Sequence, residues 1–263
     1  MSQTPMPQIS GKMYLFEKPE LLSKEQHGKY GMKPSTKPFG FCAKIRAVPI
    51  TISEFIASGR QYPIIFSAEK SLVPLAVLGV IDDANLFVKE DGRWEEHLYI
   101  PAYLRRYPFA LANETGGERV AVIFDAAHEG ISVGGEKPFF VNGQPSEEMQ
   151  AAIEFCKQYE GDKIQTEQAM RALETYDLIA QQTAQYGPSR DSEQKPFAQY
   201  FGVDEKRLNE LSDEKFLELR RSGLLPLVIA QMMSMGNWRT ILERRARRFN
   251  LTVETILERV KLS

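Results

Sequence analysis

Short apolar segments rich in Val, Ile, Phe and Tyr follow one another between residues 41 and 141, and turn residues separate them. Their length and composition predict β-strands. Pro49, Pro63 and Pro74 lie within or at the start of three segments. Because proline cannot donate a hydrogen bond to a sheet, those strands should be edge strands or should bend there. The predicted strands are residues 45–52, 62–68, 72–80, 85–90, 93–100 and 119–125.

Two local patterns indicate how these strands connect. Asp91-Gly92 joins two of the segments, and this dipeptide supplies the positive φ angles that a two-residue hairpin requires. Only one short helical pattern, ISEFIASG at residues 52–59, interrupts the strands. The pattern therefore predicts a curved, mostly antiparallel sheet and not a parallel sheet with helices between its strands.

Helical periodicity replaces the strand pattern after residue 146. Ser146 is a predicted N-cap, and the helix that follows buries Cys156 on its apolar stripe. A second helix is predicted over about 163–182, and the composition of residues 185–197 predicts a loop.

Helical patterns continue from residue 203 to the end of the chain. Residues 203–223 predict two short capped helices, with Ser212 as the cap of the second. Residues 224–248 predict one buried helix, or two that meet near Gly236-Asn237. Apolar residues at helical spacing from Leu251 onward predict a final amphipathic helix.

Together these patterns predict an α+β protein. A β-rich part, residues 41–141, is expected to pack against an α-rich part, residues 146–248. No linker-like composition separates the two parts, so we expect one domain over residues 24–248. A flexible lead-in (1–23) is predicted before it and a helical extension (249–263) after it.

Composition excludes several classes of protein. The 33 Lys and Arg residues balance 35 Asp and Glu residues, so no global field attracts nucleic acid or an anionic membrane. The longest apolar run, residues 224–235, is too short to span a bilayer, which takes about 20 residues. The N-terminal segment lacks the pattern of a secretory signal. Two cysteines, Cys42 and Cys156, are more typical of a reducing compartment than of a disulfide. We expect a soluble, cytoplasmic protein.

The chain lacks the common sequence motifs of metal sites, nucleophilic catalysis and phosphate binding. His27, His97 and His128 lack the spacing of metal ligands, and no C-x-x-C motif is present. The nucleophile motif G-x-S-x-G and the glycine-rich phosphate loops are also absent. We expect no metal site and no cofactor, and we expect Cys156 to pack as a small hydrophobic residue.

An arginine-rich segment near the end of the chain has two interpretations. Five arginines fall within residues 239–248. They are either the solvated face of a helix, with cations near its C-terminus, or a patch that binds an anion or nucleic acid. The near-neutral chain favours the first interpretation over nucleic-acid binding. The arginines are Arg239, Arg244, Arg245, Arg247 and Arg248.

The segment YIPAYLRRYPFAL, residues 99–111, places two adjacent arginines between apolar stretches. If the segment is a strand that leads into a turn, Arg105 and Arg106 point to opposite faces. An inward guanidinium requires a carboxylate or carbonyl partner, because burying it unpaired costs several kcal/mol. Tyr103 and Tyr107 are near enough in sequence to stack on it. The partner is either an acidic residue of the α-rich part or a bound ligand.

The chain resembles the SapC family of bacterial proteins. The phrases that carry the resemblance, in order, are EQHGKYGMKP, AVPITISEFIASGRQYPIIFS, LVPLAVLGV…NLFV…GRW, YIPAYLRRYPFAL and MMSMGNWRTIL, over roughly residues 24–248. Trp238 stands where the family pattern leads us to expect Phe, and residues 249–263 lie outside that pattern. The resemblance implies a soluble bacterial protein encoded near TonB-dependent receptors, flavin-dependent halogenase-like proteins and cupin-like oxygenases. It implies no catalytic residues.

This setting favours an accessory protein of an envelope, surface-layer or uptake system, which binds a protein partner or an anionic small molecule and is not an enzyme. The alternative is an enzyme that acts on an anionic small molecule or a modified side chain. In that case Arg105 or Arg106 holds the anion, and a tyrosine or His97 donates protons. The candidate ligand-binding residues are His97, Tyr103, Arg105, Arg106, Tyr107, Asn237 and Trp238.

Overall fold

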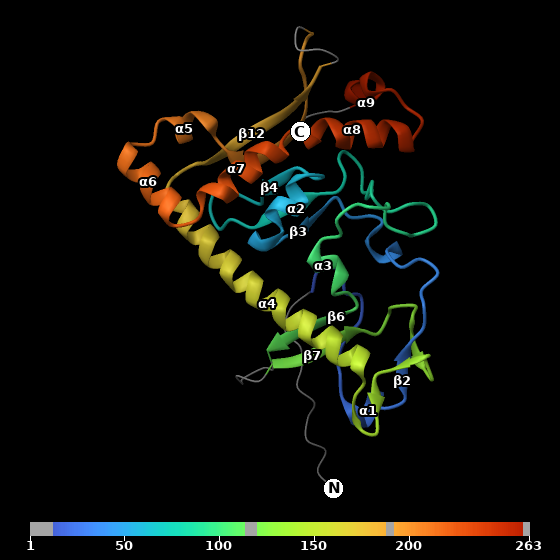
Figure 1. The fold of residues 1–263 in the computed structure, drawn as a ribbon. Helices are drawn as coiled ribbons and strands as arrows, with labels where there is room; N and C mark the ends of the chain where they lie inside the picture. The colour runs from blue at the N-terminus through green and yellow to red at the C-terminus, as the bar shows by residue number, and fades with distance from the viewer. Residues whose placement is uncertain (1–12, 114–119, 188–191, 260–263) are drawn as a thin grey trace.

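The computed structural model of the chain describes residues 13–113, 120–187 and 192–259 (Figure 1). The strands are β1 (Pro19–Leu21), β2 (Tyr30–Met32), β3 (Ala47–Pro49), β4 (Ile64–Phe66), β5 (Pro74–Val77), β6 (Phe109–Asn113), β7 (Val120–Asp125), β8 (Ile131–Val133), β9 (Lys137–Pro138), β10 (Phe140–Val141), β11 (Gln144–Pro145), β12 (Ile179–Tyr186) and β13 (Lys195–Val203). The helices are α1 (Lys24–His27), η1 (Gly40–Cys42), η2 (Ile52–Glu54), α2 (Phe55–Gly59), α3 (Ala102–Arg105), α4 (Glu147–Glu174), α5 (Glu205–Asn209), α6 (Asp213–Arg221), α7 (Leu225–Ser234), α8 (Asn237–Arg248) and α9 (Val253–Arg259).

The strands of the described residues pair in antiparallel sheets. The largest sheet has five strands in the order β12-β13-β4-β5-β3, and a three-stranded sheet has the order β1-β7-β6. The other sheets are β8-β2-β9 and the hairpin β10-β11. A β-rich first half and a helix-rich second half confirm the predicted α+β class. Pro49 lies on β3, an edge strand of the five-stranded sheet, as its missing N–H requires.

Two of the predicted strands do not form. Between residues 85 and 100 the structure has only an isolated bridge between Val88 and Trp94, around the predicted turn at Gly92, whose φ is 76°. The carbonyls of Asn85 and Val88 accept hydrogen bonds from Arg248 of α8. The Arg248 side chain thus donates to backbone carbonyls that could otherwise accept from a neighbouring strand.

The helical prediction for residues 146–197 is wrong in two places. The two predicted helices are one, α4, which begins at the predicted cap Ser146 and ends at Glu174. The chain then forms the long hairpin β12–β13, which includes part of the predicted loop 185–197. Phe201 of β13 pairs with Phe66 of β4, so this hairpin joins the sheet of the first half. Pairing across 135 residues is invisible to local periodicity.

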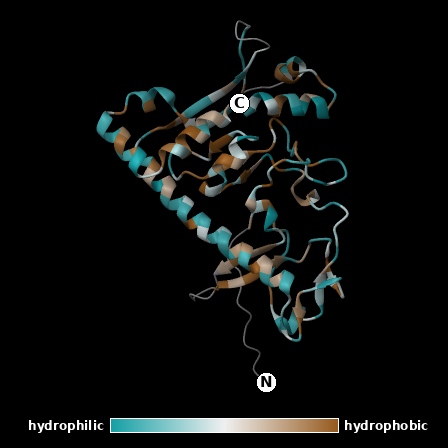
Figure 2. Cartoon of the chain, viewed as in Figure 1, coloured by the Kyte–Doolittle hydropathy of each residue, from teal (hydrophilic) through white to brown (hydrophobic). Residues whose placement is uncertain are grey.

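Helix α4 connects two hydrophobic cores (Figure 1). Its first half packs on a small core beside β6 and β7, through Met149 and Cys156. Its second half packs on the main core beside the five-stranded sheet, through Met170 and Leu173. In Figure 2 the helix is mostly hydrophilic, with scattered hydrophobic positions along its length. It therefore bridges the two cores instead of lying inside either of them.

The helices after residue 204 follow the prediction closely. Ser212 caps α6, and the segment 224–248 divides into α7 and α8 at Gly236. The buried Gln231 of α7 accepts from Val203 N–H of β13 (3.1 Å) and donates to Ile64 carbonyl of β4 (3.0 Å). Its amide thus completes the hydrogen bonding where β13 and β4 have a single register pair. None of the helices in the described part of the chain is long and apolar enough to cross a membrane.

The predicted domain limits, 24–248, stay a prediction. Within the predicted lead-in, residues 1–12 lie outside the described residues, and β1 pairs with β7. Within the predicted extension, α9 is helical up to residue 259, and residues 260–263 lie outside the described part.

Candidate ligand-binding site

The arginine pair lies at the end of a short helix and not on a strand. Residues 102–105 form α3, a single helical turn, and Arg106 is its C-cap. The turn is held by the buried carboxylate of Glu54, which accepts from Ala102 N–H at 2.6 Å. Consecutive helical residues point about 100° apart, so the two arginines still diverge. The expected divergence is present, but its cause is helical geometry.

Arg106 points inward and is 6 % exposed. Its guanidinium lies between the rings of Tyr103 and Tyr159, 4.3 and 4.4 Å from their centroids. Its Nη1 donates to the carboxylate of Glu160 on α4 at 3.1 Å. Among the described residues, its buried Nε has no acceptor. Arginine has five N–H donors, and this pairing leaves most of them available.

Arg105 points outward, toward solvent and the side of α4. Its Nε donates to the Ile100 carbonyl at 2.9 Å, and its Nη2 donates to the Tyr99 hydroxyl at 3.2 Å. The guanidinium stacks on Phe155, 5.0 Å from the ring centroid. Burial and the nearby carboxylate of Glu54 raise the pKa of Tyr99 to about 12, so this hydroxyl stays protonated. Arg105 is therefore anchored, but it does not line the cavity described next.

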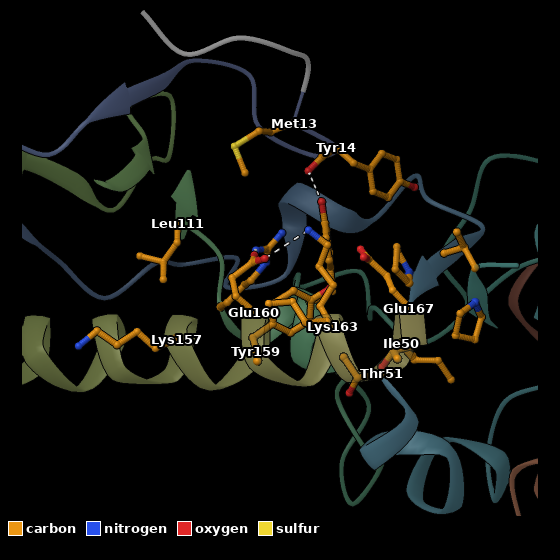
Figure 3. Close-up of a pocket in the computed structure, with 18 of the residues that line it drawn as sticks. Met13, Tyr14, Ile50, Thr51, Leu111, Lys157, Tyr159, Glu160, Lys163 and Glu167 are labelled. Atoms are coloured by element: carbon orange, nitrogen blue, oxygen red, sulfur yellow. Dashed lines mark hydrogen bonds and ion pairs between the residues drawn. The ribbon is translucent and has the colours of Figure 1, made fainter. Parts of the chain in front are cut away.

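A cavity of about 1010 Å³ lies along one face of α4 (Figure 3). Arg106 is one of the residues that line it. The α4 positions that line it run from Ile153 to Met170, a span of about 26 Å along the helix axis. Leu111 lines one end and Ile50 the other, so the cavity extends from the three-stranded to the five-stranded sheet. Most of the lining is apolar, which is typical of small-molecule sites.

Charged side chains cluster in the middle of this cavity. The carboxylate of Glu160 contacts both Arg106 and Lys163, at 3.1 and 3.2 Å. Lys157 and Glu167 line the cavity on either side of that cluster. Among the described lining residues, three cations thus face two carboxylates. The wall carries an excess positive charge and favours an anion.

Three tyrosines frame the cluster. The Tyr103 hydroxyl donates to the Tyr14 carbonyl at 2.9 Å, which holds the segment 13–14 across the cavity (Figure 3). Burial raises the pKa of Tyr14 and of Tyr159. Both phenols are therefore neutral at physiological pH, and they supply hydrogen-bonding and stacking groups without adding charge.

The remaining candidates lie elsewhere. Tyr107 stacks on Phe41 and donates to the carboxylate of Asp125 at 2.9 Å. His97 is exposed and has a φ of 62°. The structure does not bring them to the cavity, and of the predicted set only Tyr103 and Arg106 line it.

The pair at the start of α8 is also outside the cavity. Asn237 donates to the carbonyls of Gly59 and Tyr62, at 2.8 and 3.2 Å. Trp238 is 7 % exposed and packs on Phe197 and Tyr200. These contacts fasten α8 to the end of α2 and to β13.

Neither a metal cluster nor an exposed cysteine occurs among the described residues. No cluster of three or more His, Cys, Asp or Glu side chains that could hold a metal occurs there. Cys42 and Cys156 are buried and unpaired. Burial raises the pKa of Cys42 to about 12 and of Cys156 to about 11, so both remain thiols. Cys156 is 0 % exposed, in line with its predicted packing role.

Most of the arginine-rich segment binds the chain's own residues 80–95. Arg245 is 6 % exposed, donates to the Val80 carbonyl at 3.1 Å and pairs with Asp82. Arg244 lies 3.7 Å from the Glu95 carboxylate. Together with Arg248, described above, these side chains hold the segment that the sequence predicted as two strands. Arg239 pairs with Glu243 on its own helix, at 2.9 Å.

Replacing Arg245 with alanine is therefore expected to lower the free energy of unfolding by about 3 kcal/mol, because the change empties the space of a buried side chain and removes its contacts with the Val80 carbonyl, Asp82 and the Phe249 ring. Arg247→Ala on the exposed face of the same helix is the matched control, and we expect a change within about 0.5 kcal/mol. Urea unfolding followed by circular dichroism measures both. Equal effects of the two variants would contradict the structural role of Arg245.

Sequence reasoning missed the α4 side of the cavity. Tyr159 and Glu160 lie between the two predicted helices, and Lys163 stands at the start of the second. The signal was present in the sequence: residues 160–168 (EGDKIQTEQ) are polar or charged except for Gly161 and Ile164. Such a polar interval within the helix can supply the charged wall of a cavity.

The comparisons with known proteins give one result. The family model described as SapC matches residues 22–241, which is most of the chain. Apart from Met13 and Tyr14, the residues that line the cavity fall within the matched range. No curated protein and no solved structure matches the chain. The chain belongs to the SapC family.

Proposed function

We propose that this SapC-family protein is a ligand-binding accessory protein of a bacterial envelope, surface-layer or TonB-dependent uptake system. Its ligand is an anionic small molecule held in the α4 cavity. The observation that carries the proposal is the buried guanidinium of Arg106. It lines a large cavity and donates to Glu160 through Nη1, while its Nε has no acceptor among the described residues.

The pairing with Glu160 alone is a weak reason for this burial. Removing a guanidinium and a carboxylate from water costs about as much as their attraction returns, so an apolar pair of similar volume is often as stable. A bound anion adds charge-assisted hydrogen bonds to the unused donors. The tyrosine rings fix the plane of the guanidinium before the ligand arrives, which lowers the entropic cost of binding.

The family setting supports the accessory role, and two buried, unpaired thiols are consistent with action in the cytoplasm. Of the residues that the enzyme hypothesis offers, only Arg106 and Tyr103 line the cavity, and the Tyr103 hydroxyl already donates to the Tyr14 carbonyl. We therefore favour binding over catalysis.

The adjacent arginines give a matched test. With anilinonaphthalenesulfonate as an anionic fluorescent probe, Arg106→Gln should weaken binding at least tenfold, or about 1.4 kcal/mol, while Arg105→Gln changes it less than twofold. Thermal melting checks that each variant folds. Lys163→Gln, at a half-exposed wall position, should weaken binding about threefold even if Arg106→Gln is unstable.

Equal probe affinity in all three variants would overturn the proposal. Native mass spectrometry of the purified protein supplies an independent readout. A small anion that copurifies with the original protein and with Arg105→Gln, and is lost from Arg106→Gln, would support it.

A further inference from the structure

The cavity divides into two arms at the charged cluster. We call the arm beside the five-stranded sheet the β3–β5 arm, and it is lined by Ile50, Leu72, Pro74, Ile164 and Met170. From Glu160 to Met170 this arm extends about 15 Å along α4. These five residues are aliphatic or thioether side chains and give the arm an apolar surface, and Thr51, Thr166 and Glu167 are its polar lining.

The polar groups beside this arm already have partners. The hydroxyl of Thr166 donates to the Asp162 carbonyl at 2.7 Å and accepts from Ile52 N–H at 2.9 Å. The hydroxyl of Thr51 donates to the Glu54 carboxylate at 3.0 Å. Glu167 lies 3.7 Å from Arg171 at the exposed edge. A polar ligand group placed in the arm would lose its hydrogen bonds to water without replacement.

The charge of the cluster sets the charge of the head group. Lys157 pairs with Glu154 at 3.6 Å, and Glu167 pairs with Arg171 at 3.7 Å. With these partners counted, four cations face three carboxylates, so one negative charge on the ligand neutralises the wall. Arg106 is held flat between two rings, and Glu160 occupies its Nη1. Because Nε is fully buried, the donors left for a ligand are Nη2 and the second N–H of Nη1, and a planar carboxylate can accept from these two side by side.

Resting on the proposed function, we propose that the ligand is a single-chain carboxylic acid amphiphile, whose carboxylate binds Arg106 and whose apolar chain fills the β3–β5 arm. Dodecanoate is a suitable probe of this class. It combines one negative charge, which can pair with Arg106, with an unbranched apolar chain, which can fill the β3–β5 arm. Neither part alone makes both contacts.

Displacement of anilinonaphthalenesulfonate separates the contributions. Dodecanoate should displace the probe at a concentration at least tenfold lower than either acetate, which lacks the chain, or dodecanol, which lacks the charge. Dodecyl phosphate, with its larger charge, should be weaker than dodecanoate. Stronger displacement by dodecyl phosphate would overturn the carboxylate assignment and indicate a phosphate-headed lipid.

Two exposed aliphatic residues test which arm holds the chain. Ile164 lines the β3–β5 arm, and Val120 lines the opposite arm; they are 55 % and 58 % exposed, so both tolerate substitution. Ile164→Asp should weaken dodecanoate binding at least tenfold, while Val120→Asp should change it less than twofold. The reverse order would place the chain in the other arm.

The outcomes also separate this inference from the proposed function. If the probe binds with Arg106 dependence and dodecanoate displaces it no better than acetate, the amphiphile assignment is wrong and anion binding stands. If the probe shows no dependence on Arg106, the proposed function itself fails.

Discussion

Replacing Asp125 with alanine is expected to lower the free energy of unfolding by about 4 kcal/mol, because four donors that it satisfies become unpaired. Its carboxylate is 0 % exposed and accepts from the N–H groups of Glu17, Lys18 and Ala127, at 2.9, 2.8 and 3.1 Å. It also accepts from the Tyr107 hydroxyl at 2.9 Å. Asp125 thus fastens the segment before β1 to the end of β7 and to the residue that follows the arginine pair.

The matched control is Asp83→Ala. Asp83 pairs with Arg46 at 3.2 Å, but its side chain is 76 % exposed, so we expect a loss of less than about 1 kcal/mol. Urea unfolding at neutral pH compares the two variants. A loss at Asp125 no larger than the loss at Asp83 would contradict the anchoring role.

The role of Asp125 should also appear in the pH dependence of the free energy of unfolding. Burial by itself raises the pKa of Asp125, but the backbone N–H groups of Glu17, Lys18 and Ala127 outweigh burial and lower it. The stability that a lowered pKa contributes is present above the unfolded value, about 3.9, and is lost as the pH falls through the folded value. Between about pH 5 and pH 2 the original chain should therefore lose more stability than Asp125→Asn.

Glu54→Ala should cost about 4 kcal/mol for a related reason. The carboxylate is 3 % exposed and accepts from both the N–H and the hydroxyl of Thr51, at 2.9 and 3.0 Å. It also accepts from the Tyr99 hydroxyl at 3.0 Å and from Ala102 N–H. Truncation leaves these donors buried without an acceptor.

Glu54 also positions the arginine pair, so its loss should reach the cavity. In Glu54→Gln, which keeps the size of the side chain, we expect a smaller loss of stability, about 2 kcal/mol, together with weaker probe binding at Arg106. Glu69→Ala, an exposed glutamate in the next loop, should change stability by less than about 0.5 kcal/mol. If Glu54→Gln binds the probe as tightly as the original chain, α3 does not depend on this carboxylate for its position.

The two anchors act on the two ends of one segment. Glu54 holds residue 102 at the start of α3, and Asp125 holds Tyr107 just after Arg106. The inward guanidinium lies between these fixed points. Buried carboxylates on both sides thus explain how a single helical turn keeps Arg106 in one orientation.

Local sequence patterns were sufficient where the structure depends on neighbours along the chain. The caps Ser146 and Ser212 were predicted correctly because capping needs only residues within one turn. The division of residues 224–248 at Gly236 was one of two predicted outcomes. Arg105 and Arg106 were singled out because two charges inside an apolar stretch can be recognised from the sequence alone.

Only tertiary structure decided the features that depend on distant partners. Hairpin β12–β13 becomes part of the main sheet because Phe201 meets Phe66, and α4 stays one helix because cores on both of its halves hold it. Residues 85–100 lie outside the sheets, and Arg248 of α8 donates to two of their carbonyls, those of Asn85 and Val88. The cavity also depends on contacts between segments that are distant in the sequence. It lies where α4 crosses between two cores, and only the packing of segments more than fifty residues apart brings Arg106 to Glu160 there.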